Sequence, residues 1–196
     1  MICRISRLIL IGSIFSLAVG TAFSADTYQV DTAHSFINFK VKRAGFSYVV
    51  GRFNGFTGSA TWDESGAGQR SLEITIQTES VDTGNERRDQ HLKSPDFFNA
   101  KQFPVMTFKS SNVKETRVDG YEAAWEVTGD LSLHGVSQPL TFVLKQIGRG
   151  DDRRGTHNVG LQTEFTIKRS EFGMTNMIEM GGDEVSCSVD ILVKRQ

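Results

Sequence analysis

The sequence predicts an all-β domain of antiparallel strands, and three features support this prediction. After residue 26, apolar side chains recur at every second position, whereas helical periodicity is rare. Segments rich in glycine and polar residues separate the apolar runs and favour chain reversals. Each run also has one apolar and one largely polar face, which is typical of strands that cover a core on one side only.

About eight strands follow from this alternation. Their apolar positions are Ile37, Phe39 and Val41; Val49, Gly51 and Phe53; Leu72, Ile74 and Ile76; Met106 and Phe108; Trp125, Val127, Leu131 and Leu133; Leu140, Phe142 and Leu144; Val159, Leu161, Thr163, Phe165 and Ile167; and Val185, Cys187, Val189, Ile191 and Val193. Turns are expected at 44–45, 66–68, 119–120 and 148–155. The pattern leaves a sandwich and a barrel open, although eight strands are enough for a barrel interior to hold one small ligand.

A short helical excursion is expected around residues 84–98. Thr83 and Glu86 fit a capping box, in which each side chain accepts a hydrogen bond from a backbone N–H at the start of a helix. The helix is expected to end near Leu92. The aromatic pair at 97–98 then returns to the body of the protein.

The N-terminus predicts a secretory signal peptide at residues 1–24. Two arginines precede the apolar run 8–19, which is short for a membrane span. Cleavage is expected after Ser24, with cleavage after Ala25 as the second choice and an uncleaved N-terminal anchor as the alternative. Residues 25–196 then form a single domain.

The mature chain gives little reason to expect charged partners. Loss of Arg4 and Arg7 leaves 20 basic and 23 acidic side chains, a net charge of −3. Such a chain has no electrostatic reason to bind nucleic acid or an anionic membrane surface. No second apolar stretch is long enough for a membrane span, so a soluble protein without stable membrane insertion is expected. Its one cysteine, Cys187, follows the alternation and is interpreted as a core residue rather than a redox site.

Residues for catalysis or metal binding are not grouped in the sequence. None of the four histidines has a partner at the spacing of a zinc motif, and the serine-hydrolase and phosphate-binding glycine motifs are absent. His134 precedes Gly135 at an expected hairpin tip and is interpreted as a solvated turn residue. We therefore expect no catalytic residue, no metal and no cofactor.

The sequence contains many phenylalanines, and their number and clustering bear on function. Twelve of the fourteen phenylalanines follow residue 24, with clusters at 36–56 and 97–108. Phenylalanine has no polar group, so it is buried either in a filled core or against an apolar ligand. Composition alone favours the filled core, whereas the absence of a catalytic constellation favours an apolar ligand pocket.

Five segments together resemble the YceI-like family of bacterial periplasmic proteins. They are residues 34–41, 51–58, 80–98, 103–108 and 128–136. Each is modest alone, but their order and spacing are specific, and the resemblance covers essentially the whole mature chain. It implies a periplasmic, eight-stranded, antiparallel, lipocalin-like barrel with the helical excursion beside it and an elongated apolar tunnel.

The family is described as binding polyisoprenoid chains, and some members bind fatty acids or fatty amides. The resemblance therefore implies a carrier of a long-chain lipid, such as an isoprenoid quinone or a prenyl phosphate, without catalysis. The alternatives are a stress-response protein that binds a fatty acid or fatty amide, an enzyme that acts on an isoprenoid, and an interaction module with a solid core. Family members are often dimeric, so a homodimer is a further expectation.

Candidate ligand-binding residues follow from the barrel. The expected tunnel wall comprises Ile37, Phe39, Val41, Phe53, Phe98, Met106, Phe108, Leu131, Leu133, Phe142 and Phe165. The polar residues expected to meet a lipid head group are Arg43, Arg87 and Asp89. Family members often have a histidine at the end of the first strand, where this chain has Arg43. That departure argues against a metal role there, whereas an arginine can pair with a phosphate or polarise a quinone oxygen.

Overall fold

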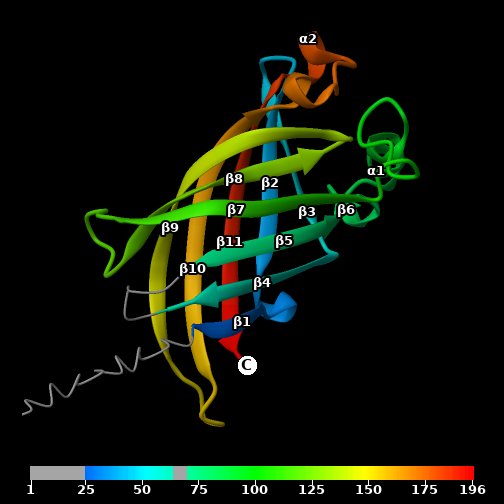
Figure 1. Ribbon diagram of the computed structural model, residues 1–196. Helices are drawn as coiled ribbons and strands as arrows, with labels where there is room; N and C mark the ends of the chain where they lie inside the picture. Colours follow the sequence, from blue (N-terminus) through cyan, green and yellow to red (C-terminus); the bar gives the residue numbers. More distant parts are fainter. Residues whose placement is uncertain (1–24, 64–69) are drawn as a thin grey trace, which may run out of the picture.

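The computed structural model describes residues 25–63 and 70–196, and within them eight strands close into an antiparallel barrel (Figure 1). In order around the ring, these strands are β1 (Asp26–Val30), β4 (Phe56–Trp62), β5 (Ser71–Gln77), β7 (Val105–Thr116), β8 (Ala124–Leu133), β9 (Val136–Asp151), β10 (His157–Lys168) and β11 (Glu184–Arg195). A pairing between β1 and β11 completes the ring. The all-β, eight-stranded antiparallel barrel is therefore confirmed.

Three further strands extend the sheet beyond β11. They are β2 (Phe36–Arg43), β3 (Ser47–Phe53) and β6 (Val81–Asp82). Strand β11 pairs with β2 over Val185–Asp190 and with β1 over its last residues. In Figure 1, β9, β10, β11 and β2 run along the length of the molecule, and β1, β4, β5 and β7 cross them.

The identity of the ring strands differs from the sequence prediction. The strands predicted at 37–41 and 49–53 are β2 and β3, which lie outside the ring, and β1 and β4 take their places. Alternation misses these two strands because both are poor in large apolar residues: β1 reads DTYQV and β4 reads FTGSATW. Their burial instead comes from single positions such as Tyr28, which is 1% exposed.

The turns follow the prediction in part. The turn at 44–45 joins β2 to β3, and both of its residues have positive φ. The turn predicted over 148–155 is shorter, because β9 continues to Asp151 and β10 begins at His157. The turn predicted at 66–68 and the signal peptide predicted at 1–24 lie outside the described residues.

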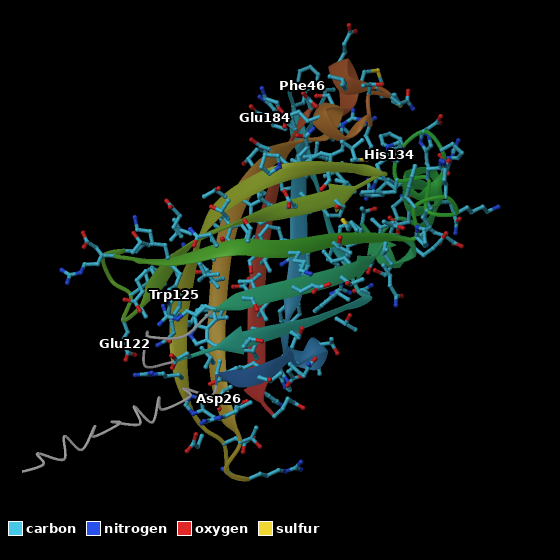
Figure 2. The ribbon with its side chains drawn as sticks, in the orientation of Figure 1. Asp26, Phe46, Glu122, Trp125, His134 and Glu184 are labelled. Carbon is cyan, nitrogen blue, oxygen red and sulfur yellow. The ribbon has the colours of Figure 1, made fainter. Side chains whose placement is uncertain are left out.

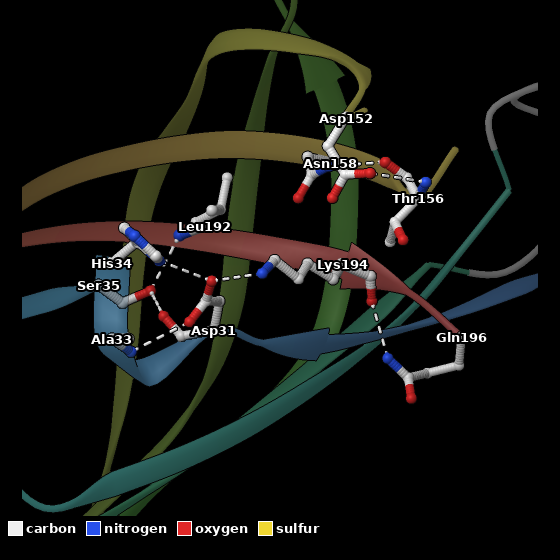
Figure 3. Close-up of polar contacts among 10 residues, drawn as sticks. All are labelled: Asp31, Ala33, His34, Ser35, Asp152, Thr156, Asn158, Leu192, Lys194 and Gln196. Atoms are coloured by element: carbon white, nitrogen blue, oxygen red, sulfur yellow. Dashed lines mark hydrogen bonds and ion pairs between the residues drawn. The ribbon is translucent and has the colours of Figure 1, made fainter. Parts of the chain in front are cut away.

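A polar cluster fixes the bend between β1 and β2, where the chain forms a 3₁₀ turn at Thr32–His34 (Figure 3). The Asp31 carboxylate accepts from Lys194 Nζ at 2.7 Å, which ties the bend to β11. The Ser35 hydroxyl donates to the Asp31 carbonyl at 2.7 Å and accepts from Leu192 N at 3.0 Å. Because of this bend, β1 pairs with the end of β11 and β2 pairs with an earlier part of the same strand.

The predicted helix is present as α1 (Glu86–Lys93), but the predicted capping box is wrong. Asn85 is the N-cap, and its side chain accepts from Arg88 N at 3.0 Å. Thr83 lies two residues earlier, where its hydroxyl donates to the Asp89 carboxylate and accepts from Arg88 Nε. Thr83 therefore joins the helix to the end of β6 rather than capping it.

A long loop between β10 and β11 contains a 3₁₀ turn (Arg169–Phe172) and α2 (Ile178–Gly181). Arg169 is 6% exposed, and its guanidinium holds the loop together. It donates at 2.7–2.8 Å to three backbone carbonyls, those of Met174, Asn176 and Gly182. Another 3₁₀ turn (Thr78–Ser80) separates β5 from β6. No helix in the described part of the chain is long and apolar enough to cross a membrane.

Candidate ligand-binding cavity

The interior of the barrel contains a cavity rather than a solid core. The space between its lining atoms, including the part open to solvent, is about 1140 Å³. Within it, about 140 Å³ can hold the centres of water-sized spheres. One water needs roughly 10–15 Å³ on that measure, so the interior has open space well beyond that of a single water.

Most of the predicted wall residues line this cavity. These are Ile37, Phe39, Phe53, Met106, Phe108, Leu131, Leu133, Phe142 and Phe165. They come from β2, β3, β7, β8, β9 and β10, so the ring together with the strands that extend it beyond β11 brings together residues that are far apart in the sequence. Their contact with a ligand stays a prediction.

Two predicted wall residues lie outside the lining. Val41 pairs with Val185, one inward position beyond the Phe39–Cys187 pair that does line the cavity. Phe98 is not among the lining residues either, but its ring meets the Phe53 ring edge to face with centroids 5.6 Å apart. Phe98 therefore packs against a wall residue, and its own contact with a ligand stays a prediction.

Several lining residues were not among the predicted wall. Most of them share the inward parity of strands that the alternation does identify: Leu72, Ile74, Ile76, Leu140, Leu144, Leu161, Ile167, Val189, Ile191 and Val193. These residues would have been predicted if every inward-facing position of each strand had been assigned to the wall. Val30 and Trp62 lie on the two strands that the alternation misses.

Aromatic rings form two groups in the cavity wall. In one group, the Phe39 and Phe53 rings lie 5.5 Å apart between centroids. In the other group, Phe142 lies between Phe108 at 5.1 Å and Phe165 at 5.4 Å. These rings present broad apolar surfaces and add packing contacts to any hydrocarbon chain between them.

The cavity offers little polar chemistry. Among the described residues, its polar lining is limited to Asn38, Ser59, Thr163 and Cys187, and the Thr163 hydroxyl already donates to the Val143 carbonyl at 2.8 Å. Burial raises the pKa of the Cys187 thiol to about 12. The thiol is therefore almost wholly protonated at neutral pH and is a poor nucleophile.

The three residues predicted to meet a head group do not line the cavity. Arg43 is exposed at the end of β2, and Arg87 is exposed on α1. Asp89 accepts from the backbone N–H of Thr83 at 2.9 Å and bonds its hydroxyl, so its carboxylate stabilises the start of the helical excursion. A role in ligand binding for these three residues stays a prediction.

The histidines are dispersed over the molecule. His134 does occupy a hairpin tip, but it is half-buried, so its interpretation as a solvated residue is wrong. Its ring packs on Phe103 with centroids 4.8 Å apart, and its Nδ1 lies 3.0 Å from the Phe172 carbonyl. In the described ranges, no group of three or more His, Cys, Asp or Glu side chains is arranged to hold a metal ion.

Comparisons with known proteins agree with this architecture. The model of the YceI-like domain matches residues 28–194. The UPF0312 protein of Pseudomonas aeruginosa (strain LESB58) is 39% identical over 179 residues, which are 90% of this chain and 91% of that protein. The crystal structure of Burkholderia cenocepacia BcnA aligns with a TM-score of 0.73 at 25% identity, covering 83% of this chain and 98% of that one. A polyisoprenoid binding domain from Saccharophagus degradans shares the fold, with a TM-score of 0.68 at 20% identity over 86% of this chain and 98% of that one.

Proposed function

The chain belongs to the YceI-like family, and from this premise we propose that it binds a long-chain apolar lipid in its barrel and carries it without altering it chemically. The observation that carries this proposal is the cavity itself, whose walls are almost wholly aliphatic and aromatic. Its one ionisable lining group within the described residues is Cys187, and a thiol with a pKa of about 12 is a poor acid or nucleophile at neutral pH. Binding is the activity that such a surface supports best.

The ligand class that we propose is a polyisoprenoid, such as an isoprenoid quinone or a prenyl phosphate. The Saccharophagus domain that shares this fold is named for polyisoprenoid binding, which supports the proposal. A fatty acid or fatty amide is the second candidate, because the same walls accept an unbranched chain. Branched isoprene units fill a wider channel than a linear chain does, so a direct comparison of the two chain types separates the candidates.

Burial of hydrocarbon supplies the affinity. Each CH₂ group that leaves water contributes about 0.8 kcal/mol, whereas association itself costs roughly 4–15 kcal/mol. Short chains therefore bind weakly, and affinity rises with chain length until the cavity is full. If the channel is closed at its far end, the affinity should stop rising once the chain reaches a defined length.

A titration with prenyl alcohols of increasing length tests the proposal. Trp62 lines the cavity, so its fluorescence reports on occupancy. We expect the dissociation constant to fall by roughly tenfold for every two carbons at first and then to level off. Absence of binding at every length, or an affinity independent of length, would refute a lipid-binding function.

A matched pair of variants controls for surface adsorption. Cys187 lies between Phe39 on β2 and Phe165 on β10, so Cys187→Phe places a third ring in the cavity. Cys187→Ala removes the same thiol and leaves the space open. Lipid affinity should fall at least tenfold in the first variant and stay near that of the wild type in the second.

We further propose that the protein acts in the periplasm after cleavage of residues 1–24. The basic and apolar layout of that segment supports the proposal. The intact mass of the protein isolated from its own host tests it. A chain that begins at Ala25 is expected, and a chain that retains the whole segment would contradict cleavage.

A further inference from the structure

The wall of the barrel is paired along only part of the boundary between β9 and β10. In the described part of the chain, the backbone pairing of these two strands ends at Gln162 and Lys145. Beyond that pair, residues 136–144 of β9 pair only with β8, and residues 163–168 of β10 pair only with β11. In Figure 1, the start of β9 turns towards α1, whereas β10 continues towards the loop that contains α2. A strand rises about 3.3 Å per residue, so the unpaired edge of β10 is roughly 20 Å long.

Two residues at these edges suit the separation of the strands. Where the pairing ends, the Thr163 hydroxyl donates to the Val143 carbonyl at 2.8 Å, so a side chain rather than a backbone N–H of β10 reaches this carbonyl. Farther along the free edge of β9, Pro139 has no N–H to donate to a neighbouring strand. Proline within sheets is confined largely to edges and bulges. The residues therefore end the pairing of β9 with β10 instead of continuing it.

A space lies between the two free edges and leads inward from the surface. We call it the side opening and define it by residues 138–140 of β9 and residues 166–168 of β10, which line it from its two sides. It encloses about 750 Å³, including the part open to solvent. Leu131, Leu140 and Ile167 line both the side opening and the lipid cavity. The two spaces are therefore contiguous.

Figure 2 shows where the side opening lies along the barrel. Glu184 lines it, and this residue is near the end of the barrel that carries Phe46. Trp125 lies towards the other end. Trp62 contacts Trp125 with ring centroids 4.8 Å apart and also lines the cavity. A chain that enters at the side opening therefore has the length of the cavity in front of it before it reaches Trp62.

The exposure of inward-facing residues changes where the pairing ends. On the paired part of β9 and β10, Leu144 is 7% exposed and Leu161 is 9% exposed. Phe142, Phe165 and Ile167 have the same inward parity and line the same cavity, but each of them is only half-buried. Solvent therefore reaches the apolar interior beside the side opening.

Two stacked rings bridge the separated strands. When the register of Gln162 and Lys145 is continued along the strands, Phe142 of β9 lies opposite Phe165 of β10. The centroids of these rings are 5.4 Å apart, and their planes differ by 22°. A contact between two rings can break and re-form without loss of the surrounding sheet, because no backbone hydrogen bond between β9 and β10 has to break with it.

The 3₁₀ turn at Arg169–Phe172 borders the side opening beyond the end of β10. Glu171 and Phe172 line the space. Gln138 Nε2 donates to the Glu171 carbonyl at 3.2 Å, and His134 Nδ1 lies 3.0 Å from the Phe172 carbonyl. These contacts join the turn to β9 and to the hairpin before it. The side opening is therefore framed by contacts at both of its ends.

We infer that the lipid enters and leaves the cavity sideways, between β9 and β10, and that the stacked pair of Phe142 and Phe165 is the gate of this route. The inference rests on the proposed function. The two rings part, the chain passes between the free edges, and its leading end then moves along the cavity towards Trp62. The paired part of the ring stays intact throughout, so exchange of the lipid requires no unfolding of the barrel.

A cleavable cross-link over the side opening tests the route. Pro139→Cys and Lys168→Cys, in the Cys187→Ala background, place thiols on the two exposed edges. A bis-maleimide with an internal disulfide joins them, and mass spectrometry verifies the link. Uptake of a prenyl alcohol, followed by Trp62 fluorescence, should become roughly tenfold slower or more, and reduction of the linker should restore the rate.

A matched cross-link controls for the reagent. Lys40 of β2 and Ser186 of β11 are exposed partners in a part of the sheet that is already paired. Lys40→Cys and Ser186→Cys, joined by the same linker in the same background, leave the side opening free. The uptake rate of this protein should stay within about twofold of that of the unlinked protein.

A pair of substitutions tests the gate without a cross-link. Phe165→Leu removes one ring of the stacked pair, and Phe39→Leu removes a ring from the other aromatic group of the wall. Phe165→Leu should raise the uptake rate and the release rate together, by about threefold or more, so that the dissociation constant changes less than either rate. Phe39→Leu should leave the uptake rate unchanged.

The outcomes separate the route, the gate and the proposed function. Equal uptake rates of the two cross-linked proteins would overturn the side route and leave lipid binding intact. Slow uptake after cross-linking over the opening, together with equal effects of Phe165→Leu and Phe39→Leu, would support the route and overturn the gate. Failure of the unlinked protein to bind any prenyl alcohol would overturn the proposed function together with the inference.

Discussion

Gly51 of β3 and Phe39 of β2 are direct partners across the two strands, and the Phe39 ring occupies the space where a side chain at position 51 would lie. A Cβ at position 51 would overlap that ring and approach Thr83 Cγ2 at 2.7 Å. We predict that Gly51→Ala lowers the free energy of unfolding by about 1–3 kcal/mol, because a ring of the cavity wall must move. Urea denaturation measures this loss.

A second substitution separates the clash from other effects of the methyl group. Phe39→Leu removes part of the ring, so Gly51→Ala should cost much less in that background. The double-mutant cycle should give a coupling energy of about 1 kcal/mol or more. Additive losses would show that the two residues do not compete for the same space.

Asp31 makes stability depend on acid pH. Hydrogen bonds from Lys194 and then His34 lower the pKa of its carboxyl to about 2, from an ordinary value of 3.8. The folded state therefore favours the ionised form, and this stabilisation is fully present above about pH 4 and is lost as the pH falls towards 2. Asp31→Asn should lower stability by on the order of 1 kcal/mol at pH 7, and its difference from the wild type should shrink between pH 4 and pH 2. Urea denaturation of both proteins over this pH range measures the gap. A gap that stays constant would contradict the assigned role.

Arg169 is predicted to hold the loop between β10 and β11. Arg169→Met leaves three backbone carbonyls without their charged donor and should reduce the free energy of unfolding by about 2–4 kcal/mol. Chemical denaturation measures the effect. Lys168→Met changes an exposed neighbour and should alter stability by less than about 0.5 kcal/mol. Similar effects for the two substitutions would argue against a structural role of the buried guanidinium.

Cys187 should react slowly in the folded protein. With a thiol pKa of about 12 in place of 9.0, the thiolate fraction at pH 8 falls about a thousandfold. Labelling with iodoacetamide, followed by mass spectrometry, should be slow in buffer and fast in urea. Ser186 is exposed on the opposite face of β11, so Ser186→Cys in a Cys187→Ala background gives a fast-reacting control. Labelling of native Cys187 within tenfold of that control would contradict its burial.

Alternation predicted the fold well where strands carry a continuous apolar face. The inward residues of β7, β8, β9 and β10 were found in this way, and most of the predicted wall lines the cavity. The same signal failed for β1 and β4, whose pairing depends on small or polar residues and on the bend at Asp31. Closure of the ring depends on the pairing of strands that are distant in the sequence, so no repeating pattern of residues predicts it.

The polar residues were harder to predict for a similar reason. Asp89 is as conspicuous in the sequence as any candidate, yet its carboxylate is used by Thr83. Arg70 and Gln146 gave no local signal, because their partners Glu115 and Glu122 are far away along the chain. The indole Nε1 of Trp125 is buried without a hydrogen-bond partner among the described residues, and only the folded structure shows this.

Native mass spectrometry of the protein purified from its own host, before and after extraction with organic solvent, tests lipid binding most directly. We expect one long-chain lipid per barrel, which extraction removes. Cys187→Phe should fail to retain this lipid, whereas Cys187→Ala should retain it. A mass equal to that of the bare polypeptide in the wild type, together with no thermal shift on addition of prenyl or fatty chains, would contradict lipid binding in the barrel cavity.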